Sequence, residues 1–224
     1  MRHVKAWVTA LAAVLGVSAL SGCSVEDVEA FLSSPSDSPS AAEGPAAESS
    51  AAARERLDEL PVSPAGPMDG YSRDRFPHWI TISPGCNTRE AVLSRDGENV
   101  ETDDECRAVS GSWLSPYDGQ TWTDAADLDI DHMVPLAEAW RSGAADWSDD
   151  RREEFANDME RAQLFAVTNS VNRSKGDQAP DQWMPPLEDY WCTYSVHWIE
   201  VKHHYELSVT EEEKATLQET LDGC

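Results

Sequence analysis

The chain has 224 residues, of which 40% are hydrophobic, and this length suits one domain with extensions. Its 17 Lys and Arg residues against 42 Asp and Glu residues give a formal net charge of −25 at pH 7. Such a charge keeps a protein soluble but repels polyanions, so the composition argues against tight, salt-driven binding of duplex DNA.

The first 22 residues have the pattern of an export signal. Two basic residues precede the apolar run 6–20, which is too short to span a bilayer comfortably, and Leu-Ser-Gly-Cys follows at 20–23. These four residues resemble a bacterial lipobox, which implies cleavage before Cys23 and lipid attachment to it. The alternative is an ordinary secretory signal with a chance Cys. We therefore expect an exported protein, lipid-anchored to the outer face of the bacterial cytoplasmic membrane or secreted.

Residues 23–68 are rich in Ser, Ala, Pro and Glu and nearly lack aromatic residues. Such a segment buries too little apolar area to offset its ordering entropy, which predicts a disordered tether with at most transient helices, for example over 51–60. The folded domain is expected over 69–224. Without residues 1–22 the chain carries 15 basic and 42 acidic residues, a formal charge of −27.

Short elements are predicted in the first half of the domain. Thr88 is placed as the N-cap of a helix that runs to Leu93, and Asp96-Gly97 is placed in a turn. Strands are predicted over 99–102, 107–113 and 120–123.

Four Cys residues remain when Cys23 is set aside, and four Cys allow three disulfide connectivities. We favour Cys86–Cys106 and Cys192–Cys224, because each pair closes a local loop and an exported chain is oxidised. A structural zinc site is the alternative, but no CxxC spacing is present.

The stretch 128–136 reads LDIDHMVPL and predicts a strand that stops at an Asp-His pair. Neighbouring strand residues point to opposite faces, so the strand end has to bend or twist for Asp131 and His132 to serve one site. A final helix is N-capped by Thr210, with Glu213 completing a capping box. Between them we predict helices over 136–141, 149–158, 169–175 and 187–205 and a strand over 164–167.

Residues 171–177 read VNRSKGD, and with the Asp-His-Met-Val-Pro run they resemble the HNH, or ββα-metal, nuclease family. Its motif opens with Asp-His before Val-Pro, continues through a strand and closes with an Asn on a short helix. The flanking segments resemble the C-terminal nuclease module of GmrSD-type modification-dependent restriction enzymes, which small secreted actinobacterial proteins also carry; these segments are 85–96, 137–147 and 172–186. The resemblance implies an α+β fold with a ββα-metal core, additional helices and short strands.

The resemblance implies that Asp131 and Asn172 hold one divalent cation, Mg²⁺ or Mn²⁺, and that His132 is the general base that takes a proton from water. Hard cations prefer such oxygen ligands, and an imidazole titrates near neutrality. Asn169 is a rival of Asn172 for the ligand role. Gln163 stands nine residues before Asn172, where many family members have an Asn that buttresses the loop carrying the base.

Asp129 stands two residues before the Asp-His pair and is expected on the face of Asp131, as an outer ligand. Arg89, Arg173 and Lys175 are candidates to contact phosphate. The leading hypothesis is a monomeric, exported endonuclease that hydrolyses DNA, or RNA, and touches the membrane through its lipid alone. One alternative is a noncatalytic surface lipoprotein that keeps the fold as a binding module. A hydrolase of a smaller phosphodiester or of a wall polymer is another.

Overall fold

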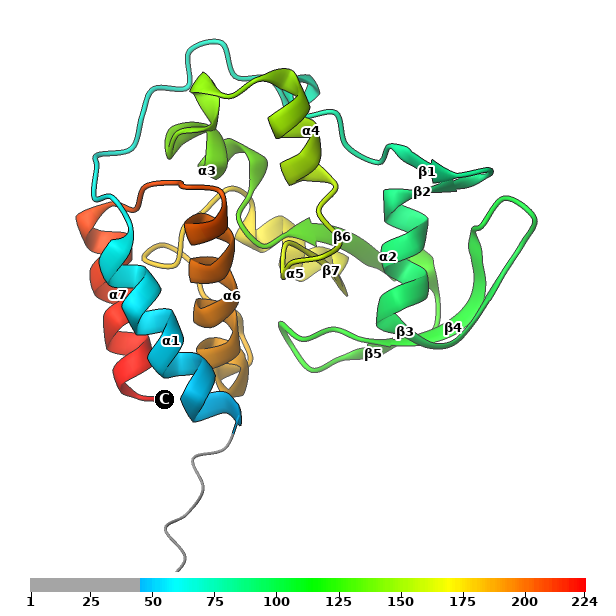
Figure 1. The fold of residues 1–224 in the computed structure, drawn as a ribbon. Coiled ribbons are helices and arrows are strands. Elements are labelled where there is room, and N and C mark those ends of the chain that lie inside the picture. The colour runs from blue at the N-terminus through cyan, green and yellow to red at the C-terminus, as the bar shows by residue number, and fades with distance from the viewer. Residues whose placement is uncertain (1–44) are drawn as a thin grey trace, which may run out of the picture. The chain divides into compact units, whose positions relative to one another are not determined.

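The computed structural model describes residues 45–224, so the export signal and Cys23 lie outside the described residues. Figure 1 shows a mixture of helices and small sheets, as an α+β fold requires. The first half contains α1 (Pro45–Glu59), η1 (Arg73–Arg75), β1 (Thr81–Ser83), β2 (Cys86–Asn87), α2 (Thr88–Asp96), β3 (Gly97–Thr102), β4 (Ala108–Leu114), β5 (Thr121–Trp122) and η2 (Ala125–Asp127). The second half contains β6 (Leu128–His132), α3 (Leu136–Arg141), η3 (Ala144–Asp146), α4 (Asp149–Ala156), β7 (Leu164–Thr168), α5 (Asn169–Lys175), η4 (Glu188–Tyr190), α6 (Trp191–His204) and α7 (Glu211–Asp222).

The centre of the fold is the antiparallel hairpin of β6 and β7, whose register runs from Leu128 opposite Thr168 to His132 opposite Leu164. Leu128 and Ile130 point to one face of β6 and pack in a cluster with α2. Asp129 and Asp131 point to the other face of β6, where α5 lies. The hairpin is therefore covered on both faces, by α2 and by α5.

Helices α1, α6 and α7 pack beside one another, which Figure 1 shows in blue, orange and red. Ala53 and Leu57 lie four residues apart on one face of α1, and Leu60 follows directly after the helix; all three are buried in the main hydrophobic cluster. The prediction of a disordered tether up to residue 68 is thus wrong over 45–60. The Ala-rich composition of residues 45–60 gave little sign of the few apolar residues on one side of the helix. These residues are buried because α6 and α7 cover them.

A buried ionic cluster joins α3, α6 and α7. The ammonium of Lys202 contacts Glu138 at 3.0 Å and Glu213 at 2.7 Å, and the indole of Trp198 donates to Glu213 at 2.6 Å. Thr210 caps α7 and forms the predicted capping box with Glu213. One carboxylate therefore both begins α7 and fixes that helix to its neighbours.

The remaining strands form a three-stranded sheet in the order β3-β4-β5 and a pair of β1 with β2. The indole of Trp113 in β4 donates to the carbonyl of Leu93, which attaches the sheet to α2. Asn87, not Thr88, is the N-cap of α2, because its side chain accepts from the amide of Glu90. Both predicted disulfides, Cys86–Cys106 and Cys192–Cys224, are present.

Within 45–224, no helix is long and apolar enough to cross a membrane.

Truncating Leu57 to Ala should lower the free energy of unfolding by about 2–5 kcal/mol, because it empties a buried position between α1 and α6. The matched control is Glu55→Ala on the exposed face of the same helix, which we expect to change stability by less than about 0.5 kcal/mol. Denaturant unfolding measures both. Equal stability of the two variants would contradict the packing of α1.

Stability should fall on acidification because of His197, which stacks on Phe165 at 5.3 Å between ring centroids. Burial lowers the pKa of His197 from 6.5 to about 4. As the pH falls through this window, the unfolded chain binds the proton and the folded chain does not, so unfolding is favoured. His197→Phe should make the loss of unfolding free energy between pH 7.5 and pH 5 smaller. An unchanged loss would mean that His197 does not contribute to it.

Candidate functional site

A cavity of about 350 Å³ opens where β6 ends beside α5. The three residues predicted as base and metal ligands line it: Asp131, His132 and Asn172. Arg173 also lines it, as do residues from outside the motif. The two halves of the motif are about forty residues apart in the chain, yet they meet at one cavity. The remaining lining residues are Tyr71, Arg73, Ile130, Pro135, Leu136, Ala137, Gly176 and Asp177.

The docking of α5 on β6 follows from two residue spacings. Asn172 and Lys175 are three apart on a helix and share a face, while Asp129 and Asp131 are two apart on a strand and share a face. The amide nitrogen of Asn172 donates to Asp129 at 3.3 Å, and the ammonium of Lys175 contacts Asp131 at 2.5 Å. Gly176, with a φ of +58°, ends the helix directly afterwards. These two contacts set the helix on the hairpin.

Asp131 is 5% exposed and its Oδ2 accepts two hydrogen bonds, from Lys175 and from the hydroxyl of Tyr117 at 2.6 Å. Burial raises the pKa of Asp131 and lowers the pKa of Lys175, so desolvation opposes the ion pair. Two further acceptors offset this cost, because Nζ also donates to the carbonyls of His132 and Met133 at 2.8 and 2.9 Å. Burial also raises the pKa of Tyr117, which keeps its hydroxyl a donor.

The imidazole of His132 is 4% exposed, and its Nε2 lies 2.9 Å from the carbonyl oxygen of Ala156. A carbonyl only accepts hydrogen bonds, so Nε2 carries the hydrogen and Nδ1 of the neutral ring carries the lone pair. Burial lowers the pKa of His132 from 6.5 to about 3, which keeps the ring neutral at pH 7. The arrangement leaves one basic nitrogen free to take a proton.

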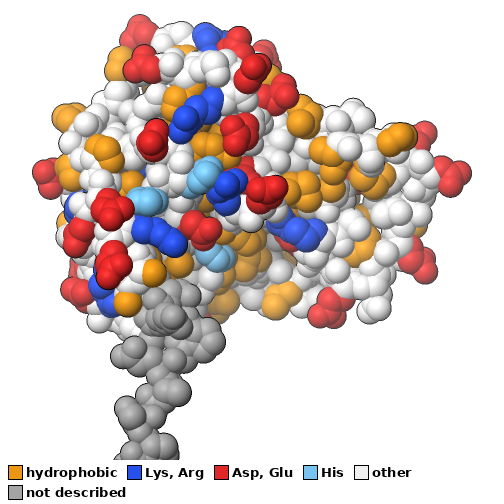
Figure 2. Space-filling view, in the orientation of Figure 1, with side chains coloured by type: hydrophobic (Ala, Val, Ile, Leu, Met, Phe, Trp, Pro, Cys, Tyr) orange, Lys and Arg blue, Asp and Glu red, His pale blue; other side chains and the backbone are white. Residues whose placement is uncertain are grey.

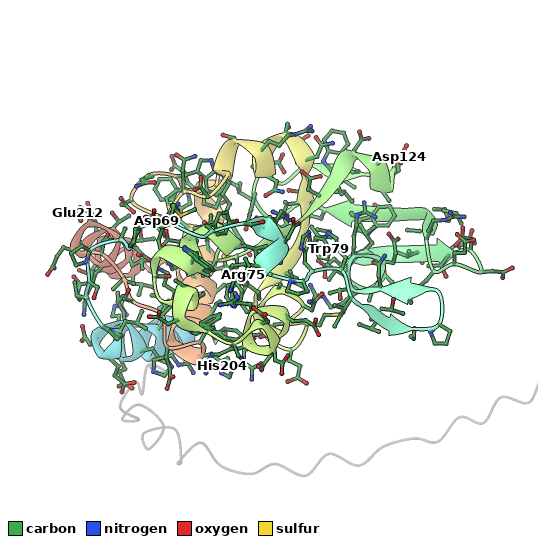
Figure 3. The ribbon with its side chains drawn as sticks, turned by 90° about the horizontal axis from the view of Figure 1, so that it is seen from above. Asp69, Arg75, Trp79, Asp124, His204 and Glu212 are labelled. Carbon is green, nitrogen blue, oxygen red and sulfur yellow. A yellow bond between two sulfur atoms is a disulfide. The ribbon has the colours of Figure 1, made fainter. Side chains whose placement is uncertain are left out.

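Trp79 stacks on His132 with ring centroids 5.5 Å apart and an interplanar angle of 29°. Figure 3 labels it between the short helix that carries Arg75 and the β1–β2 pair. Its φ of +60° is unusual for a bulky side chain and costs on the order of 1–3 kcal/mol. The fold thus holds a strained residue where its indole fixes the imidazole plane.

Gln163 is fully buried and bonds to the segment that follows the Asp-His pair. Its side-chain oxygen accepts from the amide of Val134 at 3.2 Å, and its side-chain nitrogen donates to the Val134 carbonyl at 3.1 Å. Its own carbonyl accepts from the amide of Met133 at 2.7 Å. These three bonds hold the chain after His132 in one conformation.

The other predicted residues are placed differently. Arg89 pairs with Glu90 at 2.8 Å and does not line the cavity. Lys175 is buried in an ion pair with Asp131 and does not line the cavity, whereas Arg173 does. Asn169, the rival of Asn172, has its amide nitrogen 3.4 Å from the carbonyl of Ala126, outside the cavity lining.

The oxygen atoms left at the cavity suit a hard divalent cation. No described side chain donates to Oδ1 of Asp131, and the amide of Asn172 directs its nitrogen to Asp129, which frees its oxygen. Among residues 45–224, no three His, Cys, Asp or Glu side chains are arranged as a metal site. Two protein oxygens fit an ion such as Mg²⁺, which retains several waters.

Sequence reasoning missed four residues of this region: Tyr71, Arg73, Trp79 and Tyr117. Tyr117 lies in a Pro-Tyr-Asp-Gly turn, and nothing in its spacing marks a partner of Asp131. Arg73 lies in an aromatic-rich segment that predicts only the edge of a core. A basic residue among aromatic ones in this acidic chain was the available signal.

A hairpin that ends in Asp-His, followed by a helix that brings an Asn to the same cavity, defines a ββα nuclease-like module. The C-terminal domains of GmrSD restriction endonucleases form a family that matches residues 88–220, and the chain belongs to this family.

An uncharacterized secreted protein of Arthroderma benhamiae is 60% identical over 176 residues, which are 79% of this chain and 86% of the relative. No solved structure matches the chain.

Replacing Lys175 with Met should lower the free energy of unfolding by about 3–5 kcal/mol, because it leaves the Asp131 carboxylate buried without its cation. The double variant Asp131→Asn with Lys175→Met should recover part of the loss, since it removes the unpaired charge. Denaturant unfolding of the single and double variants measures this coupling. Additive losses in the double variant would show that the two side chains do not stabilise each other.

Proposed function

We propose that the protein is a metal-dependent endonuclease, in which His132 activates water while Asp131 and Asn172 hold one divalent cation, Mg²⁺ or Mn²⁺. The observation that supports this most is that all three line one cavity with chemically free atoms: Nδ1 of the imidazole and one oxygen on each ligand residue. Membership in the nuclease family agrees with a nucleic-acid substrate.

The reaction needs a base, and His132 supplies it. Its Nδ1 accepts a proton from water as the water oxygen bonds to phosphorus and the bond to the leaving 3′ oxygen breaks, which leaves a 5′-phosphate. The Nε2 hydrogen bond to Ala156 fixes the ring and stabilises the imidazolium that forms. A phosphodiester beside the ring raises the low imidazole pKa toward neutrality, because a nearby negative charge favours the protonated form.

A bound divalent cation supplies stabilisation of the charge that develops on the phosphate oxygens and on the leaving group. Asp129 orients the amide of Asn172, and Tyr117 with Lys175 fixes the carboxylate of Asp131. These three residues therefore hold the side chains of Asp131 and Asn172 in place before any ion binds.

The proposal includes the cellular setting. We propose export with a lipid anchor at Cys23 and action as a monomer on nucleic acid outside the cytoplasm. The two disulfides and the secreted relative support export. The binding-module alternative predicts no cleavage with any divalent cation.

His132→Ala should lower the rate of Mg²⁺-dependent DNA cleavage, measured on both plasmid and single-stranded DNA, about 10²–10⁴-fold, because it removes the general base. Asn172→Ala should lower activity and raise the Mg²⁺ concentration required. The matched control Asn169→Ala, on the same helix but outside the cavity, should stay within about twofold of the wild type. Cleavage at the wild-type rate by His132→Ala would exclude this mechanism, and a lack of cleavage by the wild type would favour the binding module.

A further inference from the structure

The described part of the chain contains 15 Lys and Arg side chains, since Arg2 and Lys5 lie outside it. Twelve of the 15 form a salt bridge to a carboxylate; these are Arg54, Arg75, Arg89, Arg95, Arg107, Arg141, Arg151, Arg152, Arg161, Lys175, Lys202 and Lys214. Such pairing is expected where acidic residues are in large excess. Three residues in 45–224 depart from it: Arg56, Arg73 and Arg173.

Two of these three, Arg73 and Arg173, line the candidate site. In Arg73, Nε donates to His78 at 3.2 Å, and in Arg173, Nε donates to the carbonyl of Asn169 at 3.1 Å. A guanidinium has five N–H donors, so the terminal nitrogens of both remain without a protein acceptor. Cations without carboxylate partners are therefore concentrated at the cavity, on two elements about one hundred residues apart in sequence.

The other charged groups around the cavity are already neutralised. Asp131 pairs with Lys175 at 2.5 Å, and Asp177 pairs with Arg141 at 2.7 Å. Arg141 also contacts Glu138 at 3.0 Å. The two free guanidinium groups therefore give the cavity a locally positive character within an acidic protein.

We propose that Arg73 and Arg173 bind phosphates on the two sides of the scissile bond, and that the substrate is a short stretch of single-stranded nucleic acid held by about two phosphates. This rests on the proposed function. Guanidinium groups suit phosphate because their N–H donors match its oxygen atoms. Arg73 precedes the segment 88–220 that matches the family, so this contact comes from the N-terminal part of the domain.

The excess of acidic residues favours a flexible single strand over a long duplex. On the face of the molecule that Figure 2 shows, Lys and Arg side chains are scattered among acidic ones, with no continuous basic stripe. Duplex DNA carries one charge per about 1.7 Å of its axis, and a duplex across this surface would meet many carboxylates. A single strand bends away after the two phosphates that the arginines hold.

The test measures binding of fluorescent single-stranded oligonucleotides of 6 and 30 nucleotides, and of a 30-base-pair duplex, in EDTA to prevent cleavage. Arg73→Ala and Arg173→Ala should each weaken binding of the single strands about tenfold, and Arg73→Lys should recover part of the loss. The matched control is Arg56→Ala, an unpaired Arg outside the cavity, which should change affinity less than twofold. Thermal melting checks that each variant folds.

Salt dependence gives a second measure. Two phosphate contacts predict a slope of about −1.4 for log affinity against log salt with single strands, and Arg73→Ala should reduce its magnitude by about 0.7. The 6- and 30-nucleotide strands should bind within about threefold of each other, and the duplex more weakly. In cleavage assays Arg73→Ala should raise KM and leave kcat within about twofold, because it removes binding common to ground and transition states.

Wild-type affinity in Arg73→Ala, a slope steeper than about −4, tighter binding of the duplex, or no binding of any oligonucleotide by the wild type would each overturn this inference. If the wild type cleaves nothing but binds single strands through Arg73, the nuclease proposal fails and this inference stands. If cleavage depends on His132 but Arg73→Ala neither raises KM nor weakens binding, the nuclease proposal stands and this inference fails.

Discussion

The contact between Lys175 and the end of β6 determines the geometry of the site. One ammonium group joins the Asp131 carboxylate to the carbonyls of His132 and Met133, and all of these lie in the interior. Desolvation makes such a pair costly unless each charge has several partners, and here Lys175 has three. Lys175 lies one helical turn after Asn172, so the contacts that fix Lys175 also fix the position of Asn172. The orientation of α5 and the position of Asn172 are therefore consequences of one buried ion pair.

The acidic composition is compatible with the proposed polyanionic substrate because charge is neutralised locally. Most cations of the described residues are paired with carboxylates, so the surface as a whole offers little attraction to phosphate. The cavity differs, since Asp131 and Asp177 are paired and Arg73 and Arg173 are not. Net charge thus determines the long-range repulsion of polyanions, whereas the pattern of salt bridges determines which charged groups the cavity can bind.

Much of the central module was predictable because its signals are local. Alternating residues in 128–132 define a strand with Asp131 and His132 at its end, and Gly176 marks the end of the following helix. The two disulfide pairs also followed from loop closure in an exported chain. The predicted ends of most elements differ from the observed ends by a few residues, as for α4, which ends at Ala156 and not at 158.

What escaped prediction depends on contacts between distant segments. Helix α1 was assigned to a tether because three small or aliphatic positions carry little signal until α6 and α7 cover them. Tyr117 contacts Asp131, and Trp79 stacks on His132. Both come from irregular segments whose distance from the motif in the sequence does not indicate these contacts. Arg73 is distinguished only by the lack of an acidic neighbour, a property of the folded chain.

The two disulfides have a consequence for where this fold can persist. Cys86–Cys106 joins β2 to the segment between β3 and β4, and Cys192–Cys224 joins the start of α6 to the segment after α7. In a reducing cytosol both would be open, and each open bridge typically costs a domain about 2–4 kcal/mol. The two bridges would then form only in an oxidising compartment, so the chain would be less stable where it is synthesised than where it is oxidised.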